Sequence, residues 1–332
     1  MGEFDLIARY FTRPAAKAAL GVGDDCALLQ PTPGTQLAIS SDMLVEGRHF
    51  FADVDPGALG HKALAVNLSD LAACGATPLA FTLALALPHA DEAWLKPFSR
   101  GLLALADAHG CELIGGDTTQ GPLNLCITVF GEVPVVNGKS QALLRSGARA
   151  GDDVYVSGTL GDARLALEAK RGTITLPANV SAELLAQARQ RLEQPTPRVA
   201  LGQALRGVAS AAIDVSDGLL GDLQHILQAS QVGASIDTSV AINLIAACTQ
   251  PEWTTGLIPL NKQLEYVLAG GDDYELAFTA PVSAREAVQA AARQANTPVT
   301  RIGRIEKDPG LRLLDGQGQT LPGSFASFDH FA

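Results

Sequence analysis

Apolar residues along the first part of the chain follow strand and helix periodicities in alternation. Short apolar runs at 37–40, 81–87, 112–114 and 124–132 are typical of strands. Helical patterns cover 56–73, where Asp55 and Pro56 provide a start signal and Gly75 a stop signal, and 91–109. The residues up to 132 therefore predict a mixed α/β domain.

The second part of the chain has the same texture. Strands are predicted at 210–214, 273–278 and 299–305, and helices at 217–230 and 283–295. The segment 134–153 is rich in Gly, Ser and Arg and is expected to carry the chain from one domain to the next. We expect an α/β (α+β) fold with two mixed α/β domains, 1–147 and 148–332. Their common texture hints at related domains, although no repeat can be aligned.

The composition of the chain limits the kinds of partner that it is expected to bind. The chain has 35 acidic and 24 basic residues and a formal net charge of −11. No basic run offers a footprint for DNA or RNA, so nucleic acid is not an expected partner. No apolar stretch has membrane-spanning length and the N-terminus lacks a secretory signal pattern, so we expect a soluble, cytoplasmic protein with no membrane partner.

Aspartates recur among Gly, Ser and Thr at six places along the chain. Small neighbours leave carboxylates and main-chain amides free to face a ligand, and an acidic protein needs divalent cations to hold phosphates. Asp70 is expected near the C-terminal end of a helix, where the helix dipole is unfavourable for a carboxylate, so a bound cation explains it better than helix stability. The pattern points to several Mg²⁺ ions holding phosphates. The six places are 24–25, 42, 70, 117, 214–217 and 272–273.

Glycines give two further indications about phosphate binding. Gly115 and Gly116 follow a predicted strand and precede Asp117, which predicts a loop whose backbone approaches a ligand closely. The string at 138–140, Gly-Lys-Ser, is not a P-loop, because Val133 stands where the earlier glycine is required. Any ATP would therefore bind through another architecture.

Seven strings closely resemble, in order, the motifs of the thiamine-monophosphate kinase family, within the aminoimidazole-ribonucleotide-synthetase-like superfamily. The resemblance spans nearly the whole chain. The strings are GVGDDCA at 21–27, AISSD at 38–42, KALAVNLSDLAA at 62–73, IGGDTT at 114–119, RSGA at 145–148, IDVSDG at 213–218 and GGDDYEL at 270–276.

This resemblance implies a fold and a reaction. The N-terminal domain would share an intersubunit β-barrel with a second subunit in a homodimer, and the C-terminal domain would close over the nucleotide. The reaction would be ATP plus thiamine monophosphate giving ADP and thiamine diphosphate, as a direct Mg²⁺-assisted in-line transfer in thiamine diphosphate biosynthesis. Because the acceptor phosphate is already ionised, no general base or covalent nucleophile is expected. The alternatives are another ATP-dependent synthetase of the superfamily and a non-enzymatic cation or nucleotide sensor.

The resemblance also implies roles for individual residues. The Mg²⁺ ligands would be Asp24, Ser40, Ser41, Asp42, Asp70, Asp117, Asp214 and Asp217, with the serines acting by side chain or main chain. The ATP phosphates would contact Gly116, Asp117, Arg145 and Ser216. Asp25 could be a ligand, a residue behind the ligands or a turn former.

The thiamine end has its own candidates: His49, Asp272, Phe325 and Phe328. Thiamine carries a cationic thiazolium and a flat aminopyrimidine, which suit an acidic side chain and an aromatic face. The family often has Glu where Asp272 stands and Trp near the C-terminus, where this chain has Phe325 and Phe328.

Overall fold

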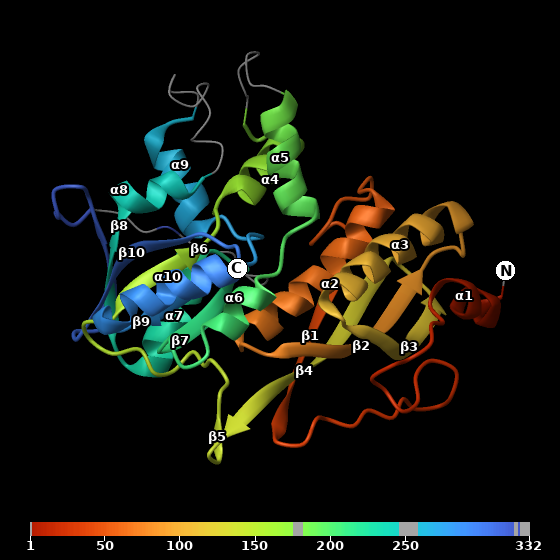
Figure 1. Cartoon of the computed structure of the whole chain (residues 1–332). Coiled ribbons are helices and arrows are strands. Elements are labelled where there is room, and N and C mark those ends of the chain that lie inside the picture. Colours follow the sequence, from red (N-terminus) through yellow and green to blue (C-terminus); the bar gives the residue numbers. More distant parts are fainter. Residues whose placement is uncertain (1, 175–181, 246–257, 322–324, 326–332) are drawn as a thin grey trace. The chain divides into compact units, whose positions relative to one another are not determined.

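The computed structural model describes residues 2–174, 182–245, 258–321 and 325. They fall into two compact units, each described by itself (Figure 1). Unit 1 comprises Met1–Leu71 and Ala76–Ala142, and unit 2 comprises Ala72–Gly75 and Leu143–Ala332. Both units combine a sheet with helices, so the predicted mixed α/β fold is confirmed. The intersubunit barrel and the closure of the C-terminal domain over a nucleotide stay predictions.

Unit 1 is built on one sheet with the strand order β1-β4-β2-β3. Neighbouring strands are antiparallel except β2 and β3, which are parallel. Helices α2 and α3 lie side by side over this sheet (Figure 1). The elements are α1 Glu3–Tyr10, β1 Thr35–Val45, α2 Pro56–Ala73, β2 Thr77–Leu87, α3 Glu92–His109, β3 Glu112–Gln120, β4 Asn124–Val136 and β5 Lys139–Ser140, which pairs with β4.

The long helices of unit 1 begin and end at residues suited to those places. Asp55 accepts the N–H of Ala58 at 2.8 Å, directly before Pro56 at the first helical position of α2. Asp91 accepts the N–H of Ala93 at 2.9 Å at the start of α3, and Gly110 ends α3 in the left-handed conformation. The sequence predicted both helices within one residue for this reason.

One prediction in unit 1 is wrong. Residues 115–119, expected as a loop, continue β3, whose register against β2 shifts between Phe81 and Thr82. Gly116 has φ 146°, and a Cβ added there would lie 1.8 Å from the carbonyl oxygen of Leu83. The glycines thus permit an irregular strand rather than a loop, which keeps Asp117 at the edge of the sheet.

Unit 2 contains a six-stranded sheet in the order β11-β8-β10-β6-β9-β7. All neighbours are antiparallel except β11 and β8. The elements are β6 Asp153–Ser157, α4 Asp162–Arg171, α5 Ala182–Glu193, α6 Val199–Ala204, β7 Ala211–Val215, α7 Leu219–Ser230, β8 Gly233–Asp237, α8 Thr238–Ala241, η1 Ile242–Leu244, α9 Leu260–Ala269, β9 Glu275–Ala280, η4 Val282–Ala284, α10 Arg285–Gln294, β10 Val299–Glu306 and β11 Gly310–Leu314.

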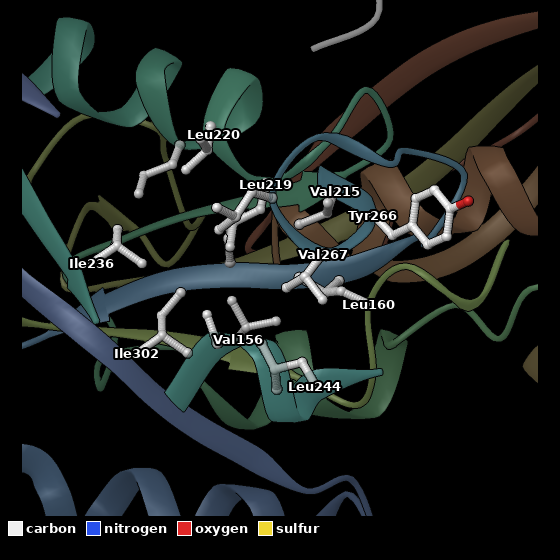
Figure 2. Close-up of a cluster of buried hydrophobic side chains, with 14 of the residues drawn as sticks. Val156, Leu160, Val215, Leu219, Leu220, Ile236, Leu244, Tyr266, Val267 and Ile302 are labelled. Atoms are coloured by element: carbon white, nitrogen blue, oxygen red, sulfur yellow. The ribbon is translucent and has the colours of Figure 1, made fainter. Parts of the chain in front are cut away.

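The core of unit 2 draws on distant parts of the chain. Figure 2 shows Val156, Val215 and Ile302 from three strands beside Leu219 and Val267 from two helices. All five side chains are buried. This core supports β7 and α7 from one side, and the turn between them carries the aspartates that the sequence singled out. None of the helices that the structure describes is long and apolar enough to span a membrane.

Candidate functional site

Strand β1 and helix α2 bring three predicted magnesium ligands together in unit 1. Side chains alternate along β1, so Ser40 and Asp42 share the face on which Leu44 is buried. Asp70 stands on α2, and its Oδ2 accepts a hydrogen bond from the Ser40 hydroxyl. The grouping therefore offers two carboxylates and a hydroxyl, which are oxygen donors of the kind that Mg²⁺ prefers.

A buried amide on α2 holds this grouping in place. The Oδ1 of Asn67 accepts the main-chain N–H of Asp42 at 3.1 Å, and its Nδ2 donates to the carbonyl of Ala63 at 3.0 Å. Asn67 is fully buried, where an unbonded amide would be costly. Asn67 was not predicted from the sequence, although a lone Asn among the apolar residues 63–68 is a usable signal.

The other predicted ligands of unit 1 lie elsewhere. The Ser41 side chain points to the opposite face of β1, and its hydroxyl lies 3.0 Å from that of Thr128. Asp117 is exposed at the far edge strand β3, with Gly116 beside it. The structure thus groups Ser40, Asp42 and Asp70. The Ser41 side chain lies on the other face of β1, and Asp117 lies on β3, which does not pair with β1.

Asp24 lies at the tip of a short hairpin. An antiparallel bridge joins Leu20 to Leu28, and the Oδ1 of Asp24 accepts the N–H of Asp25 at 2.8 Å. The Asp24 side chain thus caps its own turn, and both aspartates are exposed.

The carboxylate of Glu112 anchors the segment that leads into this hairpin. It accepts the N–H groups of Ala16, Lys17 and Ala18 at 2.9 to 3.3 Å. Burial alone would raise the pKa of Glu112, but these main-chain donors outweigh it and lower that pKa.

His49, the predicted thiamine contact of unit 1, belongs to the turn after β1. Its Nδ1 accepts the N–H of Val45 at 3.0 Å, so a neutral ring carries its proton on Nε2. The buried Lys62 of α2 donates from Nζ to the carbonyl of His49 at 3.4 Å. Val45 therefore holds the His49 ring, and Lys62 holds the His49 main chain.

In unit 2, the predicted ligands Asp214 and Asp217 flank the turn between β7 and α7. Asp214 is buried in β7, and Asp217 is partly exposed in the turn. Burial first, and the charge of Asp217 second, raise the pKa of nearby Asp222 to about 7. Several carboxylates therefore lie close together here despite their mutual repulsion. A bound divalent cation would reduce that repulsion.

The loop with the predicted thiamine residue Asp272 is tied to the same turn. The N–H of Asp272 donates to the carbonyl of Ser216, and the N–H of Tyr274 donates to that of Val215, each at 2.8 Å. Asp272 and Tyr274 have φ values of 60° and 51°, which are unusual for residues other than glycine. The structure therefore brings Asp272 beside Ser216.

Two acids at this loop are buried: Asp273, which the sequence placed among the aspartates that face a ligand, and Glu275, which it did not single out. Asp273 accepts the N–H of Gly161 at 2.9 Å, and burial raises its pKa well above the usual value. Glu275 is fully buried and pairs with Arg191 at 2.7 Å and Arg198 at 2.5 Å. Arg191 also donates to the carbonyl of Asp273 at 3.1 Å, so this ion cluster braces the loop from inside. Nothing in the local sequence pattern distinguished these acids from ligands.

Arg145 and Phe325, two further predicted residues of unit 2, have their printed contacts at other places in the unit. Ser230, at the last position of α7, donates to the carbonyl of Arg145 at 3.2 Å. Ser216 precedes the other end of this 12-residue helix, and a helix of that length spans about 18 Å. Phe325 is partly buried against the core of unit 2, and Phe328 lies outside the described residues.

The donor chemistry fits Mg²⁺ when substrate phosphates complete its coordination. Among the residues that the structure describes, no three His, Cys, Asp or Glu side chains form a ready metal cluster. Mg²⁺ in phosphate-binding sites usually takes one or two carboxylates and fills its other positions with phosphate oxygens and water. Asp42 and Asp70 in unit 1, and Asp214 and Asp217 in unit 2, offer carboxylates of the kind that this coordination uses.

The chain matches two family descriptions in succession. Residues 23–133 match the AIR synthase related protein, N-terminal domain, and residues 149–316 match the corresponding C-terminal domain.

Similar proteins were found among both sequences and structures. The chain is 45% identical to the thiamine-monophosphate kinase of Salmonella typhimurium, over 100% of this chain and 98% of that protein. The crystal structure of thiamine-monophosphate kinase from Stenotrophomonas maltophilia has a TM-score of 0.80 and 45% identity, covering 96% of each chain. The structure of AaThiL complexed with AMPPCP and TMP has a TM-score of 0.73 and 30% identity, covering 91% of this chain and 89% of that one.

Proposed function

The chain belongs to the thiamine-monophosphate kinases of the AIR synthase related family, and we propose that it transfers the terminal phosphoryl group of ATP to thiamine monophosphate, giving ADP and thiamine diphosphate. The observation that carries this proposal is full-length similarity together with the grouping of Ser40, Asp42 and Asp70 at the motif positions of that family. The relative with AMPPCP and TMP holds an ATP analogue and the acceptor together. The cytoplasmic location expected from the sequence stays a prediction.

Each unit contributes oxygen donors for magnesium. In unit 1 the proposed ligands are Asp24, Ser40, Ser41, Asp42, Asp70 and Asp117, and in unit 2 they are Asp214 and Asp217. When bound, Mg²⁺ neutralises the phosphate groups and the charge that develops on the transferring phosphoryl. The carboxylates supply this role by holding the ions through a few oxygens and leaving positions open for phosphate.

The proposed chemistry needs no proton transfer from the protein. The acceptor is a phosphate monoester, whose oxygens are ionised near neutral pH, so a general base has nothing to remove. The task of the chain is to bring two polyanions into line at a short distance. Gly116, Asp117, Arg145 and Ser216 are the proposed contacts to ATP.

The thiamine end is assigned to His49, Asp272, Phe325 and Phe328. Asp272 is the best supported of these residues of unit 2, because its loop is hydrogen-bonded to the turn that carries Ser216. A carboxylate there suits the cationic thiazolium, and an aromatic ring suits the aminopyrimidine. Phe325 is partly buried against the core of unit 2, so stacking on thiamine and packing on the core have to be tested separately.

A homodimer is supported by the outer face of β1. Leu37, Ile39 and Met43 alternate along this strand and are 41%, 60% and 54% exposed. A strand with one apolar face open to water is typical of an interface. We therefore propose that this face pairs with a second copy in the intersubunit barrel, and light scattering of Ile39→Lys against the unchanged protein tests it.

The stereochemistry at phosphorus tests the proposed mechanism. ATP with a chiral γ-phosphoryl group should give thiamine diphosphate with inverted configuration, because one direct in-line transfer inverts phosphorus once. Retention, or isolation of a phosphorylated protein that completes the reaction, would contradict direct transfer. A sensor without catalysis would instead bind Mg²⁺ and ATP and form no ADP.

A further inference from the structure

Asp222 organises the turn between β7 and α7 without belonging to the proposed ligand set. Its Oδ2 accepts the N–H groups of three successive residues, Ser216 at 3.0 Å and Asp217 and Gly218 at 3.1 Å. Three consecutive amides thus converge on one oxygen. The residue is only 4% exposed, so the carboxylate has little contact with water.

Burying the carboxyl group of Asp222 carries a desolvation cost, and the hydrogen bonds to the turn are what the protein gains from it. Asp222 lies in the first turn of α7, where its neighbours Leu219, Leu220 and Leu223 are all buried. An apolar side chain would fit such surroundings with less desolvation cost. The three amides and the positive end of the helix dipole offset part of the cost of burying this side chain, and the same three hydrogen bonds fix the conformation of the turn.

The same turn is held on its carbonyl side by another loop. The carbonyls of Val215 and Ser216 accept the N–H groups of Tyr274 and Asp272. Gly218 has φ 119°, and a Cβ added there would lie 2.8 Å from the main chain of Ala269. Asp222 on one side and the 270–274 loop on the other therefore leave the turn a single conformation.

We propose that Asp222 is a positioning residue, which holds Ser216 and Asp217 in the orientation that meets ATP phosphate and Mg²⁺ while touching neither itself. This inference rests on the proposed roles of Ser216 and Asp217. It does not depend on the identity of the phosphoryl acceptor, because only nucleotide and metal binding are invoked.

The test compares two substitutions of Asp222 with one of Asp152, which directly precedes β6 and bonds Ser210 at the start of β7. Asp222→Ala removes the acceptor, whereas Asp222→Asn keeps an oxygen in nearly the same place. Asp152→Ala is the matched control, since Asp152 is also a buried loop carboxylate and accepts the hydroxyl of Ser210 at 2.6 Å and the N–H of Arg149 at 3.0 Å. Thermal unfolding of each variant is recorded beside its binding data.

Binding is measured by calorimetry with AMPPCP and Mg²⁺, which requires no turnover. We expect Asp222→Ala to weaken binding roughly ten-fold or more, as loss of a residue behind metal ligands does, and Asp222→Asn to recover most of it. Asp152→Ala should lose a similar amount of thermal stability with unchanged binding. In turnover assays, Asp222→Ala should raise the Mg²⁺ requirement and the KM for ATP but leave the KM for the acceptor unchanged.

Two results would overturn the inference. One is that Asp222→Ala and Asp152→Ala lose the same thermal stability and bind AMPPCP with the same affinity. Asp222 would then have only a structural role. The other is Asp222→Asn as damaging as Asp222→Ala, because an acceptor oxygen would then not be what the turn requires. A protein that makes no thiamine diphosphate while Asp222→Ala weakens AMPPCP binding would contradict the proposed function and leave this inference standing.

Discussion

The main-chain N–H of Asp42 donates to the Oδ1 of Asn67 at 3.1 Å, so a fully buried amide on α2 fixes the position of a proposed magnesium ligand on β1. β1 is an edge strand of its sheet, and its outer main-chain groups have no strand partner among the described residues. Asn67 supplies one of the missing acceptors. It stands three residues before Asp70 on the same helix, so one face of α2 both holds β1 and carries a proposed ligand.

Replacing this amide should weaken metal binding more than it weakens the fold. Asn67→Ala frees the Asp42 segment, and we expect the Mg²⁺ concentration at half-maximal rate to rise roughly ten-fold, as for other residues that orient ligands. A magnesium titration at saturating substrates measures it. Asn124→Ala is the control, because the Asn124 amide donates to the carbonyl of Pro122 away from α2. An unchanged requirement in Asn67→Ala would disprove the orienting role.

Removing a proposed ligand charge should affect catalysis far more strongly. Asp42→Asn or Asp70→Asn should lower turnover by roughly several orders of magnitude with an unchanged melting temperature, because the charge that stabilises the transferring phosphoryl is lost. Asp107→Asn provides the comparison, since Asp107 forms an exposed ion pair with Arg13. Near-normal turnover of either ligand variant at saturating Mg²⁺ would refute the assignment.

Phe325 allows stacking to be separated from packing. Phe325→Leu keeps an apolar side chain against the core of unit 2 but removes the ring. Loss of a stacking contact worth about 1 kcal/mol should raise the KM for thiamine monophosphate roughly five-fold to ten-fold and leave the KM for ATP unchanged. Steady-state kinetics of Phe325→Leu and Phe325→Ala measure it. If the KM for thiamine monophosphate stays at the wild-type value in both variants, the ring only packs.

Asp153 should make stability depend on acid pH. It is buried at the start of β6, and the hydrogen bond from Arg285, with help from Arg301, lowers its pKa below the usual 3.8 despite burial. Because the folded-state pKa is lowered, the stabilisation is present above the unfolded-state pKa and is lost as the pH falls through the folded-state value.

Asp153→Asn should therefore be less stable than the unchanged protein by about 1.5 to 3 kcal/mol at neutral pH, the range for hydrogen bonds to charged groups. The difference should stay constant above about pH 5 and shrink below about pH 4. Urea unfolding of both proteins from pH 7 to pH 3 tests this. A gap that keeps its full size at pH 3 would contradict the ionised state of Asp153.

The sequence predicted the long elements well because their ends carry local signals. Pro56, Asp91 and Gly110 act within one turn of their own position, and α2 and α3 follow from them. The continuation of β3 through 115–119 was not predictable in this way. It depends on pairing with β2, where Gly116 tolerates a close approach to Leu83 that the local pattern cannot reveal.

In the proposed site, too, the residues with a local sequence signal were predicted and the others were not. Motif positions identified Ser40, Asp42 and Asp70, and the period of a strand was enough to place Ser40 and Asp42 on one face. Two residues that we propose to act through others, Asn67 and Asp222, were missed, because their roles follow from the backbone N–H groups that they accept in the structure. Arg145 stays a prediction, since its motif implied a contact to the ATP phosphates, and in the structure its main-chain carbonyl accepts the Ser230 hydroxyl at the last position of α7.

The choice of phosphoryl acceptor tests the central claim most directly. The purified protein is incubated with ATP, Mg²⁺ and either thiamine monophosphate or unphosphorylated thiamine, and the products are separated by chromatography. The account predicts thiamine diphosphate and ADP in equal amounts from thiamine monophosphate and no reaction with thiamine, because the proposed nucleophile is an ionised phosphate and the proposal includes no general base for a hydroxyl. Two results would contradict the account. One is thiamine diphosphate formed only from free thiamine, and the other is ADP formed from ATP with either acceptor while no thiamine diphosphate appears.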